Sequence, residues 1–312
     1  MVLIDNFNRQ LLNLRISITS RCNLSCDYCH KEGEEIGSCS RGKANEMKSD
    51  EIIRIAKIAI KLGISRIKVT GGEPLIRNDI CKIIHGIAII PGIKDLSMAT
   101  NGIMLELKAK SLKDRGLKRV NISLPTLDPK IYNKLTNGKI ENALNGVKSA
   151  IAAGLNPVKI NMVILKNTNV KDIPSMIAFA KKTGSILQLI ELDPINVNKQ
   201  YYSTFHEYLD DQEEYLKKEA ITIEKRPYMH NRRIYHLQNV TVEVVHPIEN
   251  REFCMHCTRL RVTSSGKLKP CLMKNDNTVN IIGPLRNGAS DKELESLFLS
   301  ANENRVPFNK KI

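Results

Sequence analysis

The chain has 312 residues, of which 42% are hydrophobic and 26% are charged, enough to bury the core of one large α/β domain with or without a smaller appendage. This composition excludes a disordered or fibrous chain, and no stretch approaches the roughly 18 apolar residues of a membrane-spanning helix. The formal net charge of +15 indicates attraction to polyanions, a class that covers nucleic acids, anionic membranes and phosphorylated small substrates.

The start of the chain and its cysteines indicate a cellular compartment. Polar residues such as Asp5 and Arg9 interrupt any signal-like apolar core. The eight cysteines lie in two tight clusters, with Cys39 and Cys81 apart from both, unlike the scattered framework of a secreted disulfide domain. We therefore expect a reducing, cytoplasmic location and cysteines that bind metal. The sequence assigns no role to Cys39 or Cys81.

Short β-branched runs alternate with helical patterns from about residue 12 to residue 190. Such alternation is typical of βα units around a parallel sheet. Ser49 begins a helical pattern that Gly63 ends. The predicted strands cover residues 14–18, 67–69, 96–99, 120–124, 158–165 and 186–190, and the predicted helices cover residues 52–62, 104–115, 140–153 and 172–182.

Six βα units are fewer than the eight of a complete barrel. The fold class predicted is therefore α/β, an incomplete (β/α)6 TIM-type barrel, formed by residues 1–193. Residues 194–312 are expected to supply connecting helices and a smaller C-terminal region that completes the active site. Within them, residues 194–238 predict a helical connection, and residues 240–245 predict a strand before the second cysteine cluster.

The first cysteine cluster, Cys22, Cys26 and Cys29, has the spacing C-x3-C-x2-C. Three thiolates on one short loop can hold a [4Fe–4S] cluster and leave its fourth iron without a protein ligand. The open iron suits the amino and carboxylate groups of S-adenosylmethionine (SAM), and an electron from the cluster can then cleave the sulfonium to a 5′-deoxyadenosyl radical. The alternative is a structural zinc loop with His30 as the fourth ligand.

The residues after the next predicted strand favour the iron–sulfur interpretation. Gly71 and Gly72 allow backbone to approach a ligand closely. Carbonyl oxygens and Glu73 are then available to the amino group of SAM. The aromatic Tyr28, immediately before the third cysteine, also favours an iron–sulfur cluster over zinc. The active site is expected at the C-terminal strand ends, where this segment falls.

The second cysteine cluster, Cys254, Cys257 and Cys271, has the spacing C-x2-C-x13-C. It could be a zinc ribbon completed by His256. Arg259 and Arg261 follow at alternate positions, so on an extended segment they point the same way and form a fork suited to phosphate oxygens.

With these two clusters and the segment from Thr258 to Arg261, nearly the whole chain resembles the GTP 3′,8-cyclase family of radical SAM enzymes, the molybdenum cofactor biosynthesis protein A family. The resemblance implies two [4Fe–4S] clusters, one binding SAM through Cys22, Cys26 and Cys29 and one contacting the guanine of GTP from Cys254, Cys257 and Cys271. Carried over by position, the SAM contacts are Tyr28, Gly72 and Ser123. The implied GTP contacts are Arg15, Lys68, Lys159, Arg259 and Arg261, a set of cations that suits a triphosphate.

The resemblance also implies a lyase reaction, the first step of molybdenum cofactor biosynthesis. The deoxyadenosyl radical abstracts the ribose 3′ hydrogen, the carbon radical attacks C8 of guanine, and reduction with protonation gives 3′,8-cyclo-7,8-dihydro-GTP. No side chain is assigned a catalytic role, because the cluster and SAM carry the chemistry. The implied partners are an electron donor and the downstream enzyme that makes cyclic pyranopterin monophosphate. A homodimer is compatible with the sequence, and neither nucleic acid nor membrane is expected as a partner.

Some positions depart from the family pattern. Ala99, Gln188 and Asp193 replace residues that make contacts in many members, and the chain ends at Phe308 to Ile312 without a Gly-Gly tail. Two other functions compete. A peptide-modifying radical SAM maturase would carry more C-terminal cysteines, and a zinc-stabilised nucleic-acid-binding protein would offer more than 4% aromatic residues for stacking.

Overall fold

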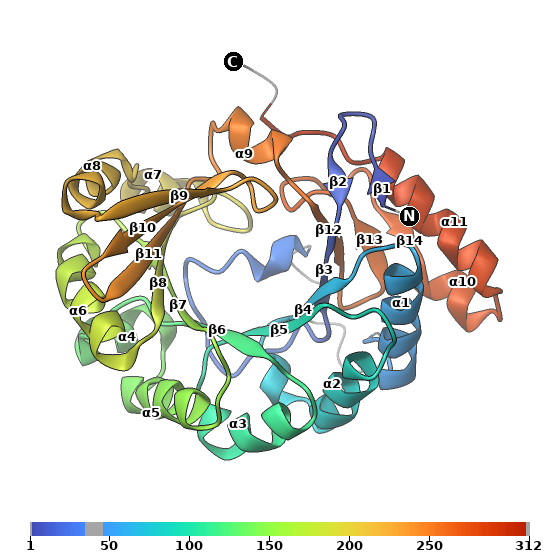
Figure 1. Ribbon diagram of the computed structural model, residues 1–312, viewed down its shortest axis with the longest axis horizontal. Helices are drawn as coiled ribbons and strands as arrows, with labels where there is room; N and C mark the ends of the chain where they lie inside the picture. Colours follow the sequence, from blue (N-terminus) through green and yellow to red (C-terminus); the bar gives the residue numbers. More distant parts are fainter. Residues whose placement is uncertain (1, 35–45, 310–312) are drawn as a thin grey trace.

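The computed structural model describes residues 2–34 and 46–309, so Cys39 lies outside the described residues. Its centre is a run of parallel strands that follow one another both in the chain and in the sheet. Figure 1 shows them arranged as a ring, with the blue loop that follows β3 lying across its interior. The strands are β3 (Asn13–Ser17), β4 (Arg66–Thr70), β5 (Asp95–Thr100), β6 (Arg119–Ser123), β7 (Val158–Ile164) and β8 (Ile186–Glu191).

The C-terminal part of the chain extends this sheet at both edges. β11 (Val240–Val245) pairs in parallel with β8, and β12 (Arg259–Val262) pairs in parallel with β3. Antiparallel strands continue beyond them, and the sheet of the described residues runs from β14 to β9 without closing. The predicted incomplete barrel is confirmed. The outer strands are β9 (Thr222–Arg226), β10 (Arg232–Leu237), β13 (Lys267–Lys269) and β14 (Val279–Asn280), and a small β1–β2 ribbon joins Leu3–Ile4 to Gln10–Leu11.

The prediction of a helical connection over residues 194–238 was wrong for its second half. α7 (Lys199–Phe205) and α8 (Asp210–Glu219) are helices, but β9 and β10 form an antiparallel hairpin. Its turn uses two residues with positive φ, His230 and Asn231. Charged side chains on both faces of these strands hid the two-residue alternation that marks a strand.

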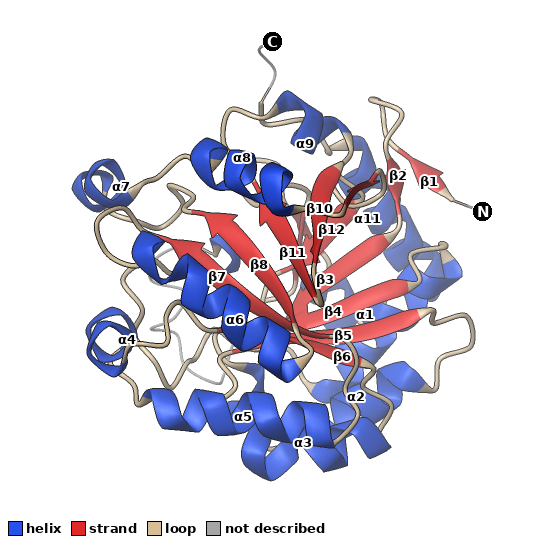
Figure 2. Ribbon diagram, turned by 60° about the vertical axis from the view of Figure 1, so that its left-hand side comes forward, coloured by secondary structure: helices blue, strands red, loops and turns tan. Residues whose placement is uncertain are grey.

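Helices cover the outer face of the parallel strands (Figure 2). Apolar side chains alternate along each strand and point outward to these helices, as Val69, Ile122 and Ile160 do in the buried core. The sequence patterns missed α2 and α4, whose short apolar runs were not read as helices. The helices along this face are α1 (Ser49–Lys61), α2 (Ile80–Ala88), α3 (Leu105–Asp114), α4 (Pro129–Thr136), α5 (Ile140–Ala152) and α6 (Ile173–Thr183).

Three further helices follow in the C-terminal part: α9 (Arg251–Met255), α10 (Ile282–Arg286) and α11 (Asp291–Glu303). α11 packs against α1, and Arg54 of α1 donates a hydrogen bond of 2.9 Å to Asp291. Among the described helices, none has both the length and the apolar character needed to cross a membrane.

We predict that Gly146→Ala destabilises the fold. A Cβ at this position of α5 would lie 2.0 Å from the carbonyl oxygen of Gly102, so backbone must shift, at a cost of about 1–3 kcal/mol. Urea unfolding measures the loss, with Asn142→Ala on the exposed face of the same helix as the control. Equal unfolding midpoints for the two variants would contradict this account of the α5 packing.

Candidate functional site

The side of the strands that faces away from the helices is polar and cationic. In the parallel register Arg261 lies opposite Arg15, and Arg15 lies opposite Lys68. Farther round the sheet, Asn121 lies opposite Lys159. Because side chains alternate between the two faces of a strand, these residues project into the interior of the open barrel.

The five cations predicted from the sequence come together in this interior. Lys68 Nζ donates to Oδ1 of Asn121 at 2.8 Å. Burial lowers the pKa of Lys68 well below its ordinary value, and the charges of Arg15, Arg259 and Lys159 lower it further. Arg261 in turn lowers the pKa values of Arg15 and Arg259 after the larger effect of burial. These side chains therefore share one buried region of positive potential.

The sequence patterns missed further cations in the same interior. Arg232 of β10 is only 7% exposed. Its charge lowers the pKa of Arg259 more than any other nearby charge does, second only to burial. Arg119 of β6 also acts on Lys68 and donates from Nε to Asp95 at 2.9 Å. Arg232 was overlooked because its segment was taken for helix. A strand interpretation would have separated it from Arg233, which faces the other way.

Two buried carboxylates balance part of this charge. Glu243 of β11 accepts hydrogen bonds from Lys159, from Gln188 Nε2 at 2.7 Å and from Arg226 Nη1 at 3.1 Å. Although burial opposes ionisation, Lys159 and Arg232 hold the pKa of Glu243 at about 2. Gln188, one of the positions that depart from the family pattern, is thus bonded within this group.

Glu32 is the second carboxylate. It lies 3.3 Å from Nε of Arg15 and accepts a hydrogen bond of 2.7 Å from Thr70 Oγ1. Burial raises its pKa, but Arg15 and His30 lower it to about 2. Both carboxylates are therefore ionised at neutral pH, and each holds a cation in place.

The first cysteine triad lies on the loop that follows β3. Burial, together with the neighbouring Cys29 and Cys22, raises the pKa of the Cys26 thiol to about 12, so the three sulfur atoms are close enough to affect one another. Backbone N–H groups of Leu24 and Lys31 donate to Sγ of Cys22 and Cys29, each at 3.4 Å. Such N–H donors favour thiolates over thiols.

Gly72 and Glu73 hold this loop in place. The Gly72 N–H donates to the carbonyl of Thr19 at 2.7 Å, and a Cβ at Gly72 would lie 2.1 Å from the carbonyl oxygen of Arg21. Glycine is therefore needed for packing against the cysteine loop. Glu73 is completely buried, and its carboxylate accepts from Thr100 Oγ1, Asn101 N and Leu75 N. These three donors fix the orientation of the Glu73 carboxylate, and its contact with the amino group of SAM stays a prediction.

The other residues predicted to contact SAM lie near the same end of the barrel. Tyr28 packs against the small apolar cluster of Leu135, Leu165 and Leu192, and its hydroxyl lies beside the Cys26 thiol. Ser123 is exposed at the carboxyl end of β6. Two residues that depart from the family pattern, Ala99 and Asp193, have these places in the fold. Ala99 pairs with Asn121 of the neighbouring strand β6, and Asp193 follows β8 and accepts a hydrogen bond from the Ile195 N–H at 3.2 Å.

The second cysteine triad lies at the other end of the β3–β12 strand pair. The first triad follows the end of β3, whereas Cys257 precedes Arg259, which pairs with Asn13 at the start of β3. The first triad lies at the carboxyl ends of the strands, where the active site is expected, and the second triad lies at the opposite end. Parallel pairing of β12 puts one triad at each end, and the cations lie between them.

The three thiols of the second triad lie close to one another. Burial raises the pKa of Cys271, and Cys257 and Cys254 raise it further, so these three sulfurs are neighbours. Burial opposes ionisation of Cys257 as well, but the Arg305 guanidinium and the Arg259 N–H hold its pKa below the ordinary value. A sulfur-only donor set with N–H donors suits an iron–sulfur cluster.

The histidines suggested as zinc ligands have other bonds. His30 Nδ1 accepts from the Glu32 N–H at 2.9 Å, and His256 Nδ1 lies 3.0 Å from the Glu252 carbonyl. Among residues 2–34 and 46–309, no group of three His, Cys, Asp or Glu side chains is arranged to hold a metal ion. Cys81 is on α2, with its sulfur 3.8 Å from Ser111 Oγ and apart from both triads.

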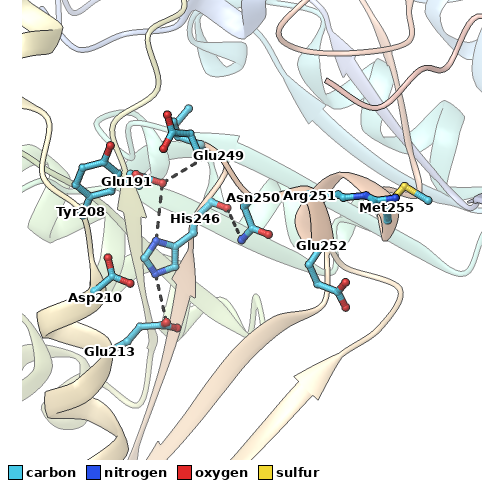
Figure 3. A pocket seen from close by; sticks show the side chains of 11 residues that line it. Glu191, Tyr208, Asp210, Glu213, His246, Glu249, Asn250, Arg251, Glu252 and Met255 are labelled. Carbon is cyan, nitrogen blue, oxygen red and sulfur yellow. Dashed lines mark hydrogen bonds and ion pairs between the residues drawn. The ribbon is translucent and has the colours of Figure 1, made fainter. Parts of the chain in front are cut away.

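A separate acidic cavity of about 790 Å³ lies beside α8 and α9 (Figure 3). His246 lies between two carboxylates, 3.8 Å from Glu191 and 3.4 Å from Glu213. Glu191 alternates with the inward-facing Gln188 along β8, so this cavity is on the helix side of the sheet. None of the residues predicted for the site lines it.

Comparison with protein families divides the chain into two matched parts. The radical SAM superfamily model matches residues 16–180, and the Molybdenum Cofactor Synthesis C model matches residues 185–311. The chain is 43% identical to the probable GTP 3′,8-cyclase of Methanocaldococcus jannaschii, over 98% of this chain and 99% of the relative. It is 44% identical to the protein of the same description from Methanosarcina acetivorans, over 98% and 90% of the two chains.

Solved structures share the fold at much lower identity. Streptococcus suis SuiB bound to S-adenosylmethionine matches with a TM-score of 0.66 and 19% identity, over 89% of this chain and 65% of that one. Native anSMEcpe with bound AdoMet and a peptide matches with a TM-score of 0.65 and 18% identity, over 96% and 84%. At this identity the likeness shows the fold alone.

Proposed function

The chain belongs to the GTP 3′,8-cyclase family of radical SAM enzymes, and from that membership we propose that it converts GTP to 3′,8-cyclo-7,8-dihydro-GTP, the first step of molybdenum cofactor biosynthesis. The observation that carries the proposal is the excess of buried positive charge between two cysteine triads. Glu243 and Glu32 neutralise only part of it. A bound triphosphate would supply several negative charges where the protein supplies too few.

The first triad, Cys22, Cys26 and Cys29, is assigned to the [4Fe–4S] cluster of the radical SAM reaction. When bound, the cluster and SAM would supply a 5′-deoxyadenosyl radical, with methionine as the other product. The conversion of GTP is assigned to the lyase class. Tyr28, Gly72 and Ser123 are assigned to the SAM site. Gly72 serves it by letting the backbone of residues 71–72 lie directly against the cysteine loop.

The second triad, Cys254, Cys257 and Cys271, is assigned to a second [4Fe–4S] cluster that binds the guanine of GTP. Arg259 lies two residues after Cys257 in the chain and faces the same interior as Arg15 and Lys68. A nucleotide with its base at this triad therefore has cationic side chains available for its phosphates. Fixing both ends of GTP restricts the ribose to one position, which is catalysis by positioning.

The phosphate site is assigned to Arg15, Lys68, Lys159, Arg259 and Arg261, with Arg232 and Arg119 added from the structure. Arginines suit phosphate because their planar fork donates two parallel hydrogen bonds. The ion pairs with Glu32 and Glu243 hold Arg15 and Lys159 in place before substrate arrives. The reaction also needs an electron donor and passes its product to the next enzyme of the pathway. A homodimer remains a further proposal.

The direct test is an anaerobic assay with GTP, SAM and a reductant. We predict that Cys22→Ala, Cys26→Ala and Cys29→Ala each abolish formation of 5′-deoxyadenosine, because three thiolates are the minimum that holds the first cluster. Cys81→Ala is the matched control, since that thiol is apart from both triads, and it should keep wild-type activity. Deoxyadenosine formation by the Cys22, Cys26 or Cys29 variants would contradict the assignment.

We predict that Arg259→Ala, Arg261→Ala and Arg232→Ala each weaken GTP binding by about 1.5–3 kcal/mol, the loss of a charge-assisted hydrogen bond. Equilibrium binding to the reconstituted protein measures the effect. Arg233→Ala is the control, because Arg233 is adjacent in sequence but pairs with Glu213 on the other face, at 3.1 Å. Lysine should rescue only in part. Wild-type affinity in all three variants would show that these arginines do not bind substrate.

We predict that GTP binding weakens as the pH rises above about 8. Burial lowers the pKa of Lys159 to about 8, although Glu243 opposes this effect, so Lys159 loses its charge as the pH rises through that value. A polyanion binds the protonated form, and each required proton costs up to about tenfold in affinity per pH unit. Lys159→Arg keeps its charge and should show a shallower slope of log Kd against pH. Equal slopes would remove Lys159 from the phosphate site.

A further inference from the structure

The two ends of the described chain meet at the second cysteine triad. Arg9, near the start, donates from Nη1 to the carbonyl of Cys254 at 3.0 Å. Arg305, near the end, donates from Nη2 to the carbonyl of Cys257 at 2.5 Å. Each triad cysteine of this short segment is therefore held through its own carbonyl oxygen by an arginine more than 40 residues away in sequence.

Asp5 joins the two arginines. Its Oδ2 accepts from Arg9 Nε at 2.8 Å and lies 3.3 Å from Arg305 Nη1. The arginines also bind one another's backbone, since Arg9 Nη2 donates to the Arg305 carbonyl at 2.8 Å and Arg305 Nη1 donates to the Arg9 carbonyl at 3.3 Å. The side chains of Asp5 and Arg305 are completely buried. The result is a closed group of three charges, which we name the carbonyl clamp.

Buried ion groups are a weak source of stability, because the cost of removing charges from water offsets much of their attraction. Apolar side chains could join the two chain ends as well. What apolar side chains cannot do is bind the carbonyls of Cys254 and Cys257. A peptide unit is planar and trans, so holding its oxygen also fixes the direction of the next N–H group. The clamp thereby constrains both the cysteines and the N–H donors around them.

We propose that Asp5, Arg9 and Arg305 are positioning residues for the second metal centre, which hold the Cys254–Cys257 segment with its thiols placed to bind the cluster. The inference rests on the proposed function, because it takes this triad as a metal site. Residues that hydrogen-bond to metal ligands without touching the metal commonly contribute to metal retention and tune the electronic state of the centre. The two fixed positive charges beside the thiolates would act in both ways.

The test compares Arg305→Lys and Asp5→Asn with Arg54→Lys. Lysine keeps the charge of Arg305 but cannot reproduce the planar fork that reaches separated acceptors, and Asp5→Asn keeps the shape but removes the charge. Arg54 is a matched control, because its guanidinium also bridges a carbonyl and a carboxylate, Ala289 at 2.6 Å and Asp291 at 2.9 Å, between α1 and the C-terminal part.

The measurements are the rate at which a chelator removes metal from the second triad, the electron paramagnetic resonance spectrum of the reduced protein, and the midpoint of global unfolding. We expect both clamp variants to lose the metal of the second triad about 10- to 100-fold faster than wild type, and to alter its spectrum while the signal of the first triad is unchanged. Arg54→Lys should match wild type.

Two outcomes would overturn the clamp. One is metal release at the wild-type rate in both clamp variants. The other is faster release only in proportion to a lower unfolding midpoint, which would make the role purely structural. Metal analysis of wild type tests the proposed function separately: about eight iron atoms per chain support two clusters, whereas zinc at the second triad would overturn the second cluster. If zinc were bound, its rate of release from the clamp variants and from wild type would still test the role of the clamp.

Discussion

Positive charge buried inside an open barrel is the constraint on which the rest of this structure depends. Like charges repel strongly where water is scarce, and burial together with the neighbouring cations lowers the pKa of Lys68 well below its ordinary value. Glu32 and Glu243 keep the arrangement tolerable by pairing with Arg15 and Lys159. They balance only part of the positive charge, and this imbalance is the basis for the proposed triphosphate site.

The fold meets this constraint by placing apolar side chains on one face of the sheet and polar side chains on the other. The stability of the parallel strands comes from apolar residues such as Val69 and Ile160, which pack under the helices, while the inner residues of the same strands are free to serve the site. A complete barrel fills its interior with bulky apolar side chains. An open sheet with strands added at both edges leaves its interior to polar groups, and the hairpin β9–β10 contributes Arg232 to it.

Parallel pairing of β12 with β3 also decides where the two cysteine triads lie. Since the first triad follows β3 and the second precedes β12, the two cysteine triads are held at opposite ends of one strand pair, with Arg15 and Arg261 between them. The second triad is also in contact with both ends of the described chain, because Arg9 binds the carbonyl of Cys254 and Arg305 binds the carbonyl of Cys257. The C-terminal part therefore continues the sheet of the barrel at both edges and contributes Arg232, Arg259 and Arg261 to its interior.

The sequence by itself determined the two cysteine triads, the fork of Arg259 and Arg261, and the order of the βα units, because ligand spacing and the two-residue alternation of a strand are local properties. It also supplied the five cations through the family resemblance. Only the tertiary structure decided that Arg232 joins them, that Glu73 accepts hydrogen bonds from Thr100, Asn101 and Leu75, and that Asp5 links Arg9 to Arg305. These outcomes depend on sheet register and on contacts between residues far apart in sequence, where a buried charge looks like any solvated one until its partner is known.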